Sequence, residues 1–290
     1  MEESASLTNF LPFALGIIML GLGLNLTIND FKRVIIYPKA VFIGLFCQMI
    51  LLPIICFGIV ILFKLPPEFG VGLMLLSASP GGATANLYSH LSEGDVALNI
   101  SLTAVNSVLT LFTLPFIVNF SINFFMDSDQ RIPMQFSKVL EVFAIVLIPV
   151  IGGMVLNKIV PNFSKKLEKP VKILSALLLI IIIFGAVYKE KDQFIGFFKE
   201  VGLASLIFNI LSMAIGYYVP SLLKINKKQR IAIGMEIGIH NATLAIYLAM
   251  NVIGNSKMSI PPAVYGILMF FTAALFGYIV KSSTKEKTLI

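Results

Sequence analysis

The chain has 290 residues, of which 57% are hydrophobic and 13% are charged, and its formal net charge is +7. Soluble domains carry about 25% charged residues, so this composition excludes an ordinary soluble protein and indicates a polytopic membrane protein. The basic residues lie in loops beside apolar segments, where lipid headgroups and membrane topology explain them, so we predict no nucleic-acid partner. The two cysteines, Cys47 and Cys56, share one apolar segment, and we interpret them as packing residues.

Apolar windows of about 20 residues, the length of a transmembrane helix, recur along the whole chain. They predict nine transmembrane helices, at about residues 8–27, 37–63, 68–91, 95–125, 137–158, 170–188, 200–222, 229–250 and 258–280. The connections are short and contain no low-complexity segment, so residues 1–290 are expected to form one domain. The acidic start of the chain lacks the basic region of a cleaved signal peptide, so the first apolar segment is expected to stay in the mature protein.

The distribution of Lys and Arg predicts how the chain is oriented in the bilayer. In the nine-helix scheme most of the 22 Lys and Arg residues fall on one side, namely Lys32, Arg33, Lys39, Lys158, Lys165, Lys166, Lys169, Lys172, Lys224, Lys227, Lys228, Arg230, Lys281, Lys285 and Lys287. The other side receives Lys64, Arg131, Lys138, Lys189, Lys191, Lys199 and Lys257. Because cytoplasmic loops are enriched in basic residues, we predict a protein of the inner (plasma) membrane, with its N-terminus outside and its C-terminus in the cytoplasm.

Two of the apolar segments contain residues that should interrupt a helix. Pro80, Gly81 and Gly82 stand in the middle of the third segment, and the eighth segment opens on Gly234 and Gly238. The interruptions occupy corresponding places in two parts of the chain, one ending near residue 125 and one starting near residue 137. This arrangement is typical of transporters with inverted repeats, whose site forms where two discontinuous helices meet near the bilayer midplane. The first part has one helix fewer, so the first helix of repeat one is expected to be missing.

Glu236 and His240 lie inside the second interrupted segment, among apolar residues. A carboxylate at bilayer depth costs about 2.5 to 3.5 kcal/mol, so it normally faces a cavity, a partner or an ion. The predicted spans place no Lys or Arg at comparable depth, which makes an internal salt bridge a poor explanation. Glu236 is therefore the first functional candidate.

Other polar groups should gather around the two interruptions. After each of them the second half-helix should present free N–H groups that favour an anion, near residues 82–84 and 239–241. The carbonyl ends of the first half-helices, near Ser79 and Glu236, should suit a cation. The fourth segment has one polar face at helical spacing, formed by Asn99, Thr103, Asn106, Ser107 and Thr110.

Three stretches of the sequence resemble the bile acid:sodium symporter family, including its bacterial members: Pro80–Asn86, Gly94–Asn99 and Glu236–Asn241. The resemblance extends across almost the whole chain. It implies two inverted repeats, in which a core domain with two crossing discontinuous helices packs against a panel domain. It also implies a secondary transporter rather than an enzyme, which imports an organic anion together with sodium and needs no organic cofactor and no obligatory protein partner.

The resemblance implies two cation sites. The first is placed at Asn86, Asn99, Thr103 and Glu236, where Ala85 stands in place of a serine ligand and Asn99 in place of another serine. Sodium is a hard cation that prefers oxygen ligands, which these four residues retain.

The second implied cation site consists of the side chains of Gln48, Glu236 and His240 and the carbonyls of Ile237 and Ile239. His240 stands where the family has a glutamine, and a neutral imidazole nitrogen is a poor ligand for sodium. Three alternatives follow. The site is lost, or the other ligands hold the ion, or a proton on His240, which titrates near neutral pH, replaces the sodium.

The substrate is predicted to be a small organic anion, either bile acid-like or a pantoate-like or keto-acid-like carboxylate. Its site is expected to include residues of both interruptions and of the last segment, namely Gly82, Ala83, Thr84, His240, Asn241, Met269 and Phe270. Bacterial relatives carry a polar pair where this chain has Met269 and Phe270. We therefore predict a more apolar cavity that suits a bulkier amphipathic anion.

Two other kinds of function fit the sequence less well. An exporter resembling the arsenite permeases would need a cysteine at the first interruption, and Pro80–Asn86 contains none. An intramembrane hydrolase using Glu236 and His240 would need a further metal ligand or a nucleophile, and the sequence has neither a His-Glu-x-x-His nor a Gly-x-Ser-x-Gly motif.

Overall fold

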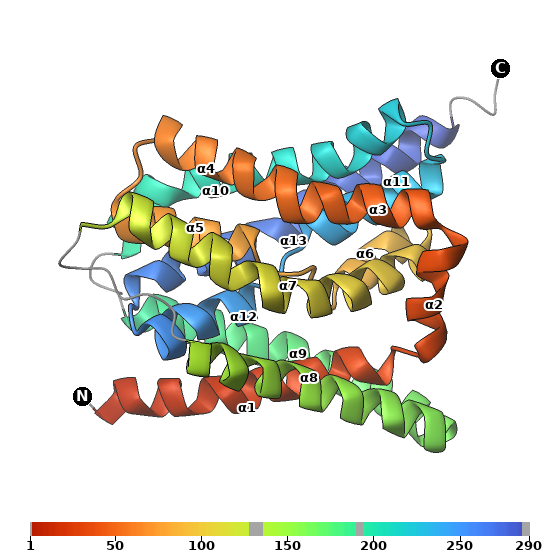
Figure 1. The fold of residues 1–290 in the computed structure, drawn as a ribbon, viewed down its shortest axis with the longest axis horizontal. Helices are drawn as coiled ribbons and strands as arrows, with labels where there is room; N and C mark the ends of the chain where they lie inside the picture. Colours follow the sequence, from red (N-terminus) through yellow and green to blue (C-terminus); the bar gives the residue numbers. More distant parts are fainter. Residues whose placement is uncertain (1, 128–135, 190–193, 286–290) are drawn as a thin grey trace.

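The computed structural model describes residues 2–127, 136–189 and 194–285, which are nearly all helical (Figure 1). The α-helices are α1 (Glu2–Leu24), α2 (Ile28–Ile36), α3 (Pro38–Phe46), α4 (Leu52–Leu62), α5 (Pro67–Ser77), α6 (Ala85–Leu91), α7 (Val96–Phe125), α8 (Phe136–Ile159), α9 (Pro161–Lys189), α10 (Phe194–Leu222), α11 (Lys227–Gly238), α12 (Ala242–Tyr247) and α13 (Ile260–Lys285). Turns of π-helix occupy Cys47–Leu51 and Leu248–Ile253, and a short 3-10 helix precedes α13. Arg131, Lys191 and Lys287, which enter the charge count, lie outside the described residues.

Six helices of the described part are long and apolar enough to cross a membrane, and the bent pair Asn9–Leu24 and Ile28–Ile36 makes a seventh if it is taken as one span. Two further apolar helices, Pro67–Ser77 and Ala242–Ile253, are shorter. They belong to the third and eighth predicted segments, which were expected to be interrupted. The chain is thus a multi-pass helical membrane protein, whereas a count of nine crossings depends on these two interrupted segments.

Helices α1, α8 and α9 pack together as one layer, and the other helices form a larger body beside it (Figure 1). Glycines bring α1 and α8 close together. A Cβ on Gly23 would lie 2.2 Å from the carbonyl oxygen of Val150, and a Cβ on Gly153 would lie 2.6 Å from that of Leu20. Small residues are common at such contacts because membrane helices associate through close packing rather than through hydrophobic burial.

The interior of the larger body is formed by the short helices of the two interrupted segments. All six residues of α12 are buried, and α11 is buried from Ile231 to Gly238. Helix α5 is buried from Phe69 to Ser77. Longer helices, among them α7, α10 and α13, pack against these short helices.

One surrounding helix carries an irregular turn that faces this interior. The π-helical turn Cys47–Leu51 precedes Pro53, whose ring nitrogen cannot donate a hydrogen bond to the preceding turn. The N–H of Leu52 bonds to the carbonyl of Cys47, five residues back, as expected for a π-helix. The turn contains Gln48, whose side chain is 2% exposed.

The same connection leads into both interrupted segments. After α4 and after α10 a lysine adopts the left-handed conformation, with φ of 50° at Lys64 and 58° at Lys224. The next residue, Leu65 or Ile225, then donates its N–H to the carbonyl five residues back. This is the bonding of a Schellman motif, which ends a helix with its last carbonyls satisfied.

Candidate functional site

The two interruptions meet and pair through their backbones. Gly82, between α5 and α6, donates its N–H to the carbonyl of Ile239 at 2.6 Å. Asn241, between α11 and α12, donates its N–H to the carbonyl of Pro80 at 2.9 Å. Each interruption thereby satisfies backbone groups that the other leaves unpaired, which matters because an unpaired peptide group inside a membrane costs several kcal/mol.

This pairing corrects one expectation. We predicted free N–H groups at both interruptions as an anion site, but the N–H groups of Gly82 and Asn241 bond to each other's segment. The side chain of Asn241 is also engaged, because its Oδ1 accepts the N–H of Leu244 at 3.0 Å and caps α12. These two N–H groups of the crossing are thus engaged before any ligand binds, and the sequence could not show that the two segments would pair with each other.

Glu236 lies at the crossing, in the last turn of α11, and is 1% exposed. Thr103 of α7 donates its hydroxyl to Glu236 Oε2 at 2.5 Å. The other carboxylate oxygen, Oε1, is buried and has no hydrogen-bond partner in the part of the chain that the structure describes. An unpaired buried carboxylate oxygen is costly, so its placement suits a bound cation.

Gly81 brings the first interruption against this carboxylate. A Cβ at Gly81 would lie 2.2 Å from Glu236 Oε1 and 2.7 Å from Oε2. A larger residue would therefore have to displace the carboxylate. Glycine is required here by space, because the backbone itself forms one wall of the site.

The predicted first cation site is partly assembled. Asn99 Nδ2 donates to the carbonyl of Ala232, on the turn of α11 before Glu236, at 2.7 Å. Asn86 lies in the first turn of α6, which packs against α11. Among the described residues, Oδ1 of Asn86 and Oδ1 of Asn99 are buried without a hydrogen-bond partner. Thr103 thus bonds directly to Glu236, and Asn99 bonds to the preceding turn of α11. The helix that carries Asn86 packs against α11.

The hydroxyl groups in the rest of the predicted polar face of α7 bond within that helix. Thr110 donates to Asn106 Oδ1 at 3.2 Å, and Ser107 donates to the carbonyl of Thr103 at 2.7 Å. These hydroxyl contacts are those of ordinary polar residues in a membrane helix. Asn99 and Thr103 of this face bond to α11, and the Asn106 side chain also lies close to the Glu236 carboxylate.

At the predicted second cation site, Gln48 and His240 both approach the backbone carbonyl of Ser79. Gln48 Nε2 donates to the carbonyl oxygen of Ser79 at 2.9 Å, and His240 Nδ1 lies 3.3 Å from the same oxygen. Gln48 Nε2 and His240 Nδ1 are 3.5 Å apart. Gln48 Oε1 and His240 Nε2 have no hydrogen-bond partner among the described residues, and both are buried. The carbonyl of Ile239, another expected ligand, already accepts the N–H of Gly82.

His240 is enclosed by two aromatic residues that sequence reasoning missed. Its ring stacks on Phe208 of α10, with the centroids 5.8 Å apart and an angle of 19° between the planes. Tyr265 of α13 meets it edge to face at 5.3 Å. The Tyr265 hydroxyl donates to the carbonyl of Gly238 at 2.8 Å, at the end of α11.

Asn209 is another residue beside the crossing that was not predicted from the sequence. Its Nδ2 donates to the Gly238 carbonyl at 2.9 Å, and its Oδ1 accepts the hydroxyl of Thr272. The usable signal was a buried amide within the apolar segment 200–222, the same kind of signal that identified Glu236. These bonds satisfy the carbonyl end of α11, so they position the second interruption.

The structure separates the residues predicted to bind substrate. Gly82 and Asn241 serve the crossing, and Ala83 and Thr84 are half-buried beside it. On α13 Met269 is 2% exposed, as a core residue is, and the half-buried Phe270 stacks on Tyr88 of α6 with the centroids 6.2 Å apart.

Known protein sequences resemble this chain over much of its length. The sequence model of the sodium bile acid symporter family matches residues 12–197. The chain is 29% identical over 263 residues to the probable chloroplastic sodium/metabolite cotransporter BASS1 of Arabidopsis thaliana, covering 89% of this chain and 63% of that protein. It is 23% identical over 282 residues to the uncharacterized sodium-dependent transporter YocS of Bacillus subtilis, covering 97% of this chain and 86% of that protein.

A mammalian protein is similar over nearly the same length. The ileal sodium/bile acid cotransporter of Oryctolagus cuniculus is 23% identical over 277 residues, which cover 94% of this chain and 79% of that protein. The chain spans less than two thirds of the Arabidopsis protein and most of the Bacillus and rabbit proteins. The family model covers well over half of the chain. The chain therefore belongs to the sodium bile acid symporter family, whose members are membrane transporters and not enzymes.

Proposed function

We propose that this protein is a secondary transporter that couples the import of a small organic anion to sodium. The observation that carries the proposal is the buried Glu236 carboxylate at the crossing of two interrupted helices, with one oxygen held by Thr103 and the other unpartnered among the described residues. The relatives named as sodium-dependent transporters support sodium as the coupling ion.

The sodium ion is proposed to bind at Asn86, Asn99, Thr103 and Glu236. Buried amide and carboxylate oxygens on α6, α7 and α11 that have no partner in the described part of the chain support this assignment, because oxygen ligands are what a hard cation needs. Sodium would neutralise the Glu236 charge and hold α11 against α7. The anion would bind beside it, near Ala83 and Thr84, and Phe270 would form an apolar boundary. In this proposal Met269 supports that boundary from the core.

The second site is proposed to bind no sodium. The amide nitrogen of Gln48 and Nδ1 of His240 face the Ser79 carbonyl. Because this carbonyl accepts hydrogen bonds from them, it is not free to bind an ion. With Nδ1 as the donor, Nε2 of His240 is an imidazole lone pair, which is a soft and poor ligand for sodium. The carbonyls of Ile237 and Ile239 and the oxygen of Gln48 would then remain as an incomplete set. A proton-coupled carrier that uses the buried His240 is the second candidate.

The proposed architecture has nine crossings in two inverted repeats. The order of elements supports it, because in each part a left-handed lysine, a short helix, an interruption and a second short helix precede a long helix. The layer of α1, α8 and α9 would be the panel, and the larger body would be the core. Alternating access would then be a movement of the core against this layer in the inner membrane, with the N-terminus outside.

Uptake into liposomes tests this function. A thermal-shift screen of carboxylates and sulfonates, in sodium and in potassium, first identifies anions that stabilise the purified protein. The selected anion should then accumulate in proteoliposomes under an inward sodium gradient, and not under an equal potassium gradient. Uptake that ignores sodium and follows a proton gradient would overturn sodium coupling and favour the carrier that uses His240.

A further inference from the structure

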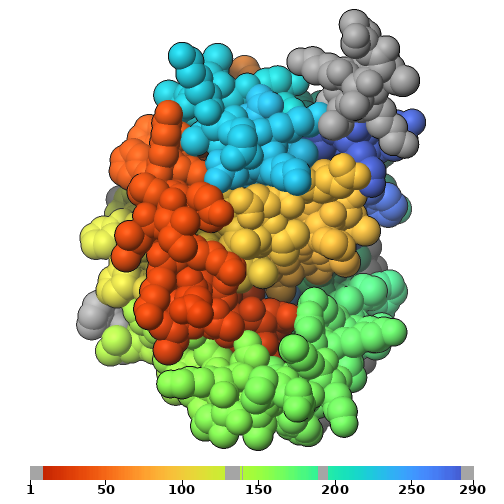
Figure 2. Space-filling model, turned by 90° about the vertical axis from the view of Figure 1, so that its right-hand side faces the viewer, coloured from red at the N-terminus to blue at the C-terminus, as the bar shows by residue number. Residues whose placement is uncertain are grey.

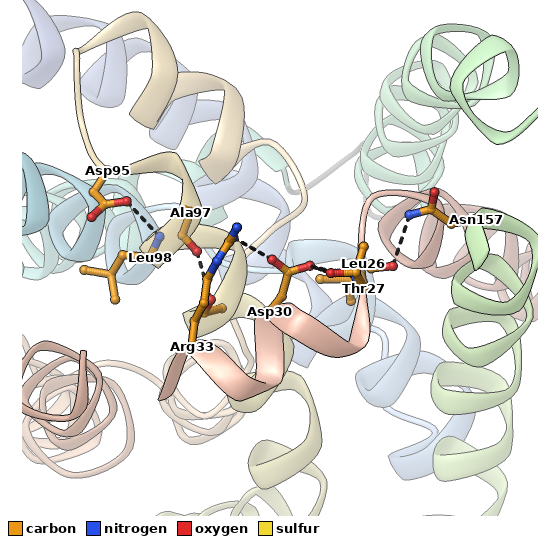
Figure 3. Close-up of polar contacts among 9 residues, drawn as sticks. Leu26, Thr27, Asp30, Arg33, Asp95, Ala97, Leu98 and Asn157 are labelled. Atoms are coloured by element: carbon orange, nitrogen blue, oxygen red, sulfur yellow. Dashed lines mark hydrogen bonds and ion pairs between the residues drawn. The ribbon is translucent and has the colours of Figure 1, made fainter. Parts of the chain in front are cut away.

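The chain bends sharply between α1 and α2 and forms a corner, residues 25–30, which is held by polar contacts. The two helix axes differ by 62°. Asn157 of α8 donates to the carbonyl of Leu26 at 3.3 Å (Figure 3). Asp30 accepts the N–H of Thr27 at 2.7 Å and pairs with Arg33 at 2.7 Å. The side chain of Arg33 points toward the first turn of α7 (Figure 3). The corner is thus fixed to the panel layer on one side and lies against the core on the other.

A pocket of about 450 Å³ lies between this corner and the last turns of α8. Its lining combines the apolar side chains of Ile28, Ile151 and Val155 with the polar side chains of Asn29, Asn157 and Lys158. Seen from one end of the molecule, the residues of α1 and α2, in red, border those of α8, in light green (Figure 2). The pocket is therefore amphipathic and lies at the surface.

The apolar part of the lining is exposed to the surroundings of the protein. The exposed fractions of Ile28 and Ile151 are both 54%. Helix α2 has only nine residues, and at its other end Ile35 and Ile36 are 81% and 64% exposed. A helix this short cannot cross a bilayer, and exposed isoleucines next to Lys32 are typical of a helix that lies in the membrane interface.

The position of the pocket relative to the membrane can be inferred from helix α8. The apolar stretch of that helix, Leu140–Ile159, is long enough to cross the membrane, and Lys158 lies at its end. Lys158 is therefore at the level of the lipid headgroups, while Ile151, two turns earlier, is at the level of the acyl chains. The neighbouring Asp30 is buried and paired with Arg33, so it presents no free negative charge to the pocket.

We propose that this pocket binds an anionic phospholipid. The lipid phosphate would lie at Lys158, with Asn29 and Asn157 as polar neighbours, and an acyl chain would follow Ile28, Ile151 and Val155. Charge selects an anionic headgroup, because the lining contains a lysine and the one nearby carboxylate of the corner is paired. This inference goes beyond the transport function and does not depend on which cation is coupled.

The chain contains no tryptophan, so a single introduced tryptophan reports its own surroundings. Val155→Trp would be reconstituted in phosphatidylcholine vesicles that contain a minor fraction of dibrominated phosphatidylglycerol, or the same fraction of dibrominated phosphatidylcholine. We expect quenching of the tryptophan fluorescence to show that the brominated phosphatidylglycerol binds about fivefold more tightly than the brominated phosphatidylcholine. This factor is the contribution of one lysine near an anionic lipid. Lys158→Gln in the same background should abolish this preference. Ile151→Trp serves as a second reporter if Val155→Trp does not fold.

Leu222→Trp is the matched control, because Leu222 is 82% exposed at the end of α10 and lies beside Lys224 but outside the pocket. A preference for phosphatidylglycerol at position 155 that exceeds the preference at position 222 and is lost with Lys158→Gln supports the site. Equal quenching by the two brominated lipids overturns it. So does a preference of the same size at position 222, or one that persists without Lys158, since either would reflect only the attraction of a basic surface for anionic lipid.

Discussion

Glu236 could be identified from the sequence because an isolated carboxylate inside an apolar segment has few explanations. The structure adds the partner on Oε2, Thr103, and the close approach of the Gly81 backbone. These could not be read from the sequence, because they depend on which face of α7 turns toward α11. Asn209 and Tyr265 illustrate the limit, since each is one of several polar groups in a mostly apolar segment and their shared acceptor, the Gly238 carbonyl, belongs to another helix.

At the residue scale, Glu236→Gln should abolish the response to sodium. Glutamine keeps an oxygen that can accept from Thr103 but removes the negative charge that balances the cation. In the unmodified protein, sodium at about 100 times its Kd should stabilise the fold by about 2.7 kcal/mol, measured as a difference between thermal unfolding in sodium and in potassium.

The control for this variant is Glu141→Gln, at an exposed carboxylate paired with Lys138 at 2.9 Å. It should retain the full sodium response, because exposed ion pairs contribute little. A sodium response in Glu236→Gln equal to that of this control would exclude the proposed cation site.

His240→Gln should increase the number of sodium ions that act together. The amide oxygen of glutamine is a harder ligand than an imidazole nitrogen, and Gln48 Oε1 is already buried nearby. We expect uptake by the unmodified protein to depend hyperbolically on sodium concentration, and uptake by His240→Gln to become sigmoidal. Sigmoidal dependence before the substitution would show that the second site already binds sodium.

At the element scale, the crossing of the two interruptions is partly predictable. Pro80 and the adjacent glycines show where α5 must end, because proline and glycine oppose a continuing helix. They do not show where the freed N–H and carbonyl groups find partners. Gly82 and Asn241 find them in each other's segment, and this long-range pairing removes these two N–H groups from the predicted anion site.

Gly81→Ala tests the crossing. Its Cβ would lie 2.2 Å from Glu236 Oε1, and the buried carboxylate has little room to move. We expect a loss of about 1 to 3 kcal/mol in stability, the usual cost of overpacking, together with weaker sodium binding. Thermal unfolding and sodium titration measure the two effects.

The matched substitution is Gly152→Ala in α8, where a Cβ would meet no atom within 4 Å. It should be neutral or stabilising by up to about 1 kcal/mol, because alanine is a better helix former than glycine. If both variants bind sodium with unchanged affinity, the Gly81 backbone is not a wall of the cation site.

At the scale of the whole molecule, hydropathy predicted the helical segments well, because a helix that crosses a bilayer must be apolar over most of its length. The long helices α7 and α10 fall on predicted windows, as does the helix Pro38–Leu62. The grouping of α1 with α8 and α9 could not be predicted. It rests on close contacts such as that of Gly23 with the Val150 backbone, and these connect distant parts of the sequence.

The predicted orientation can be measured by labelling single cysteines in intact cells. Cys47 and Cys56 are both 0% exposed, so they should contribute little background with a membrane-impermeant maleimide. Asp127→Cys, at an exposed position after α7, should react in intact cells. Lys228→Cys, at an exposed position in α11, should react only after the cells are permeabilised. The reverse pattern would place the N-terminus in the cytoplasm.

The reciprocal backbone bonds of the crossing also constrain how the protein is made. Residues that meet there, such as Ser79 and His240, are 161 positions apart in the chain. During synthesis the first interruption enters the membrane long before the second one exists, so its peptide groups must be kept solvated, or covered by the insertion machinery, until α11 and α12 arrive. We therefore expect chains truncated before residue 239 to be recognised as incomplete by membrane quality control, although most of their hydrophobic segments are already inserted.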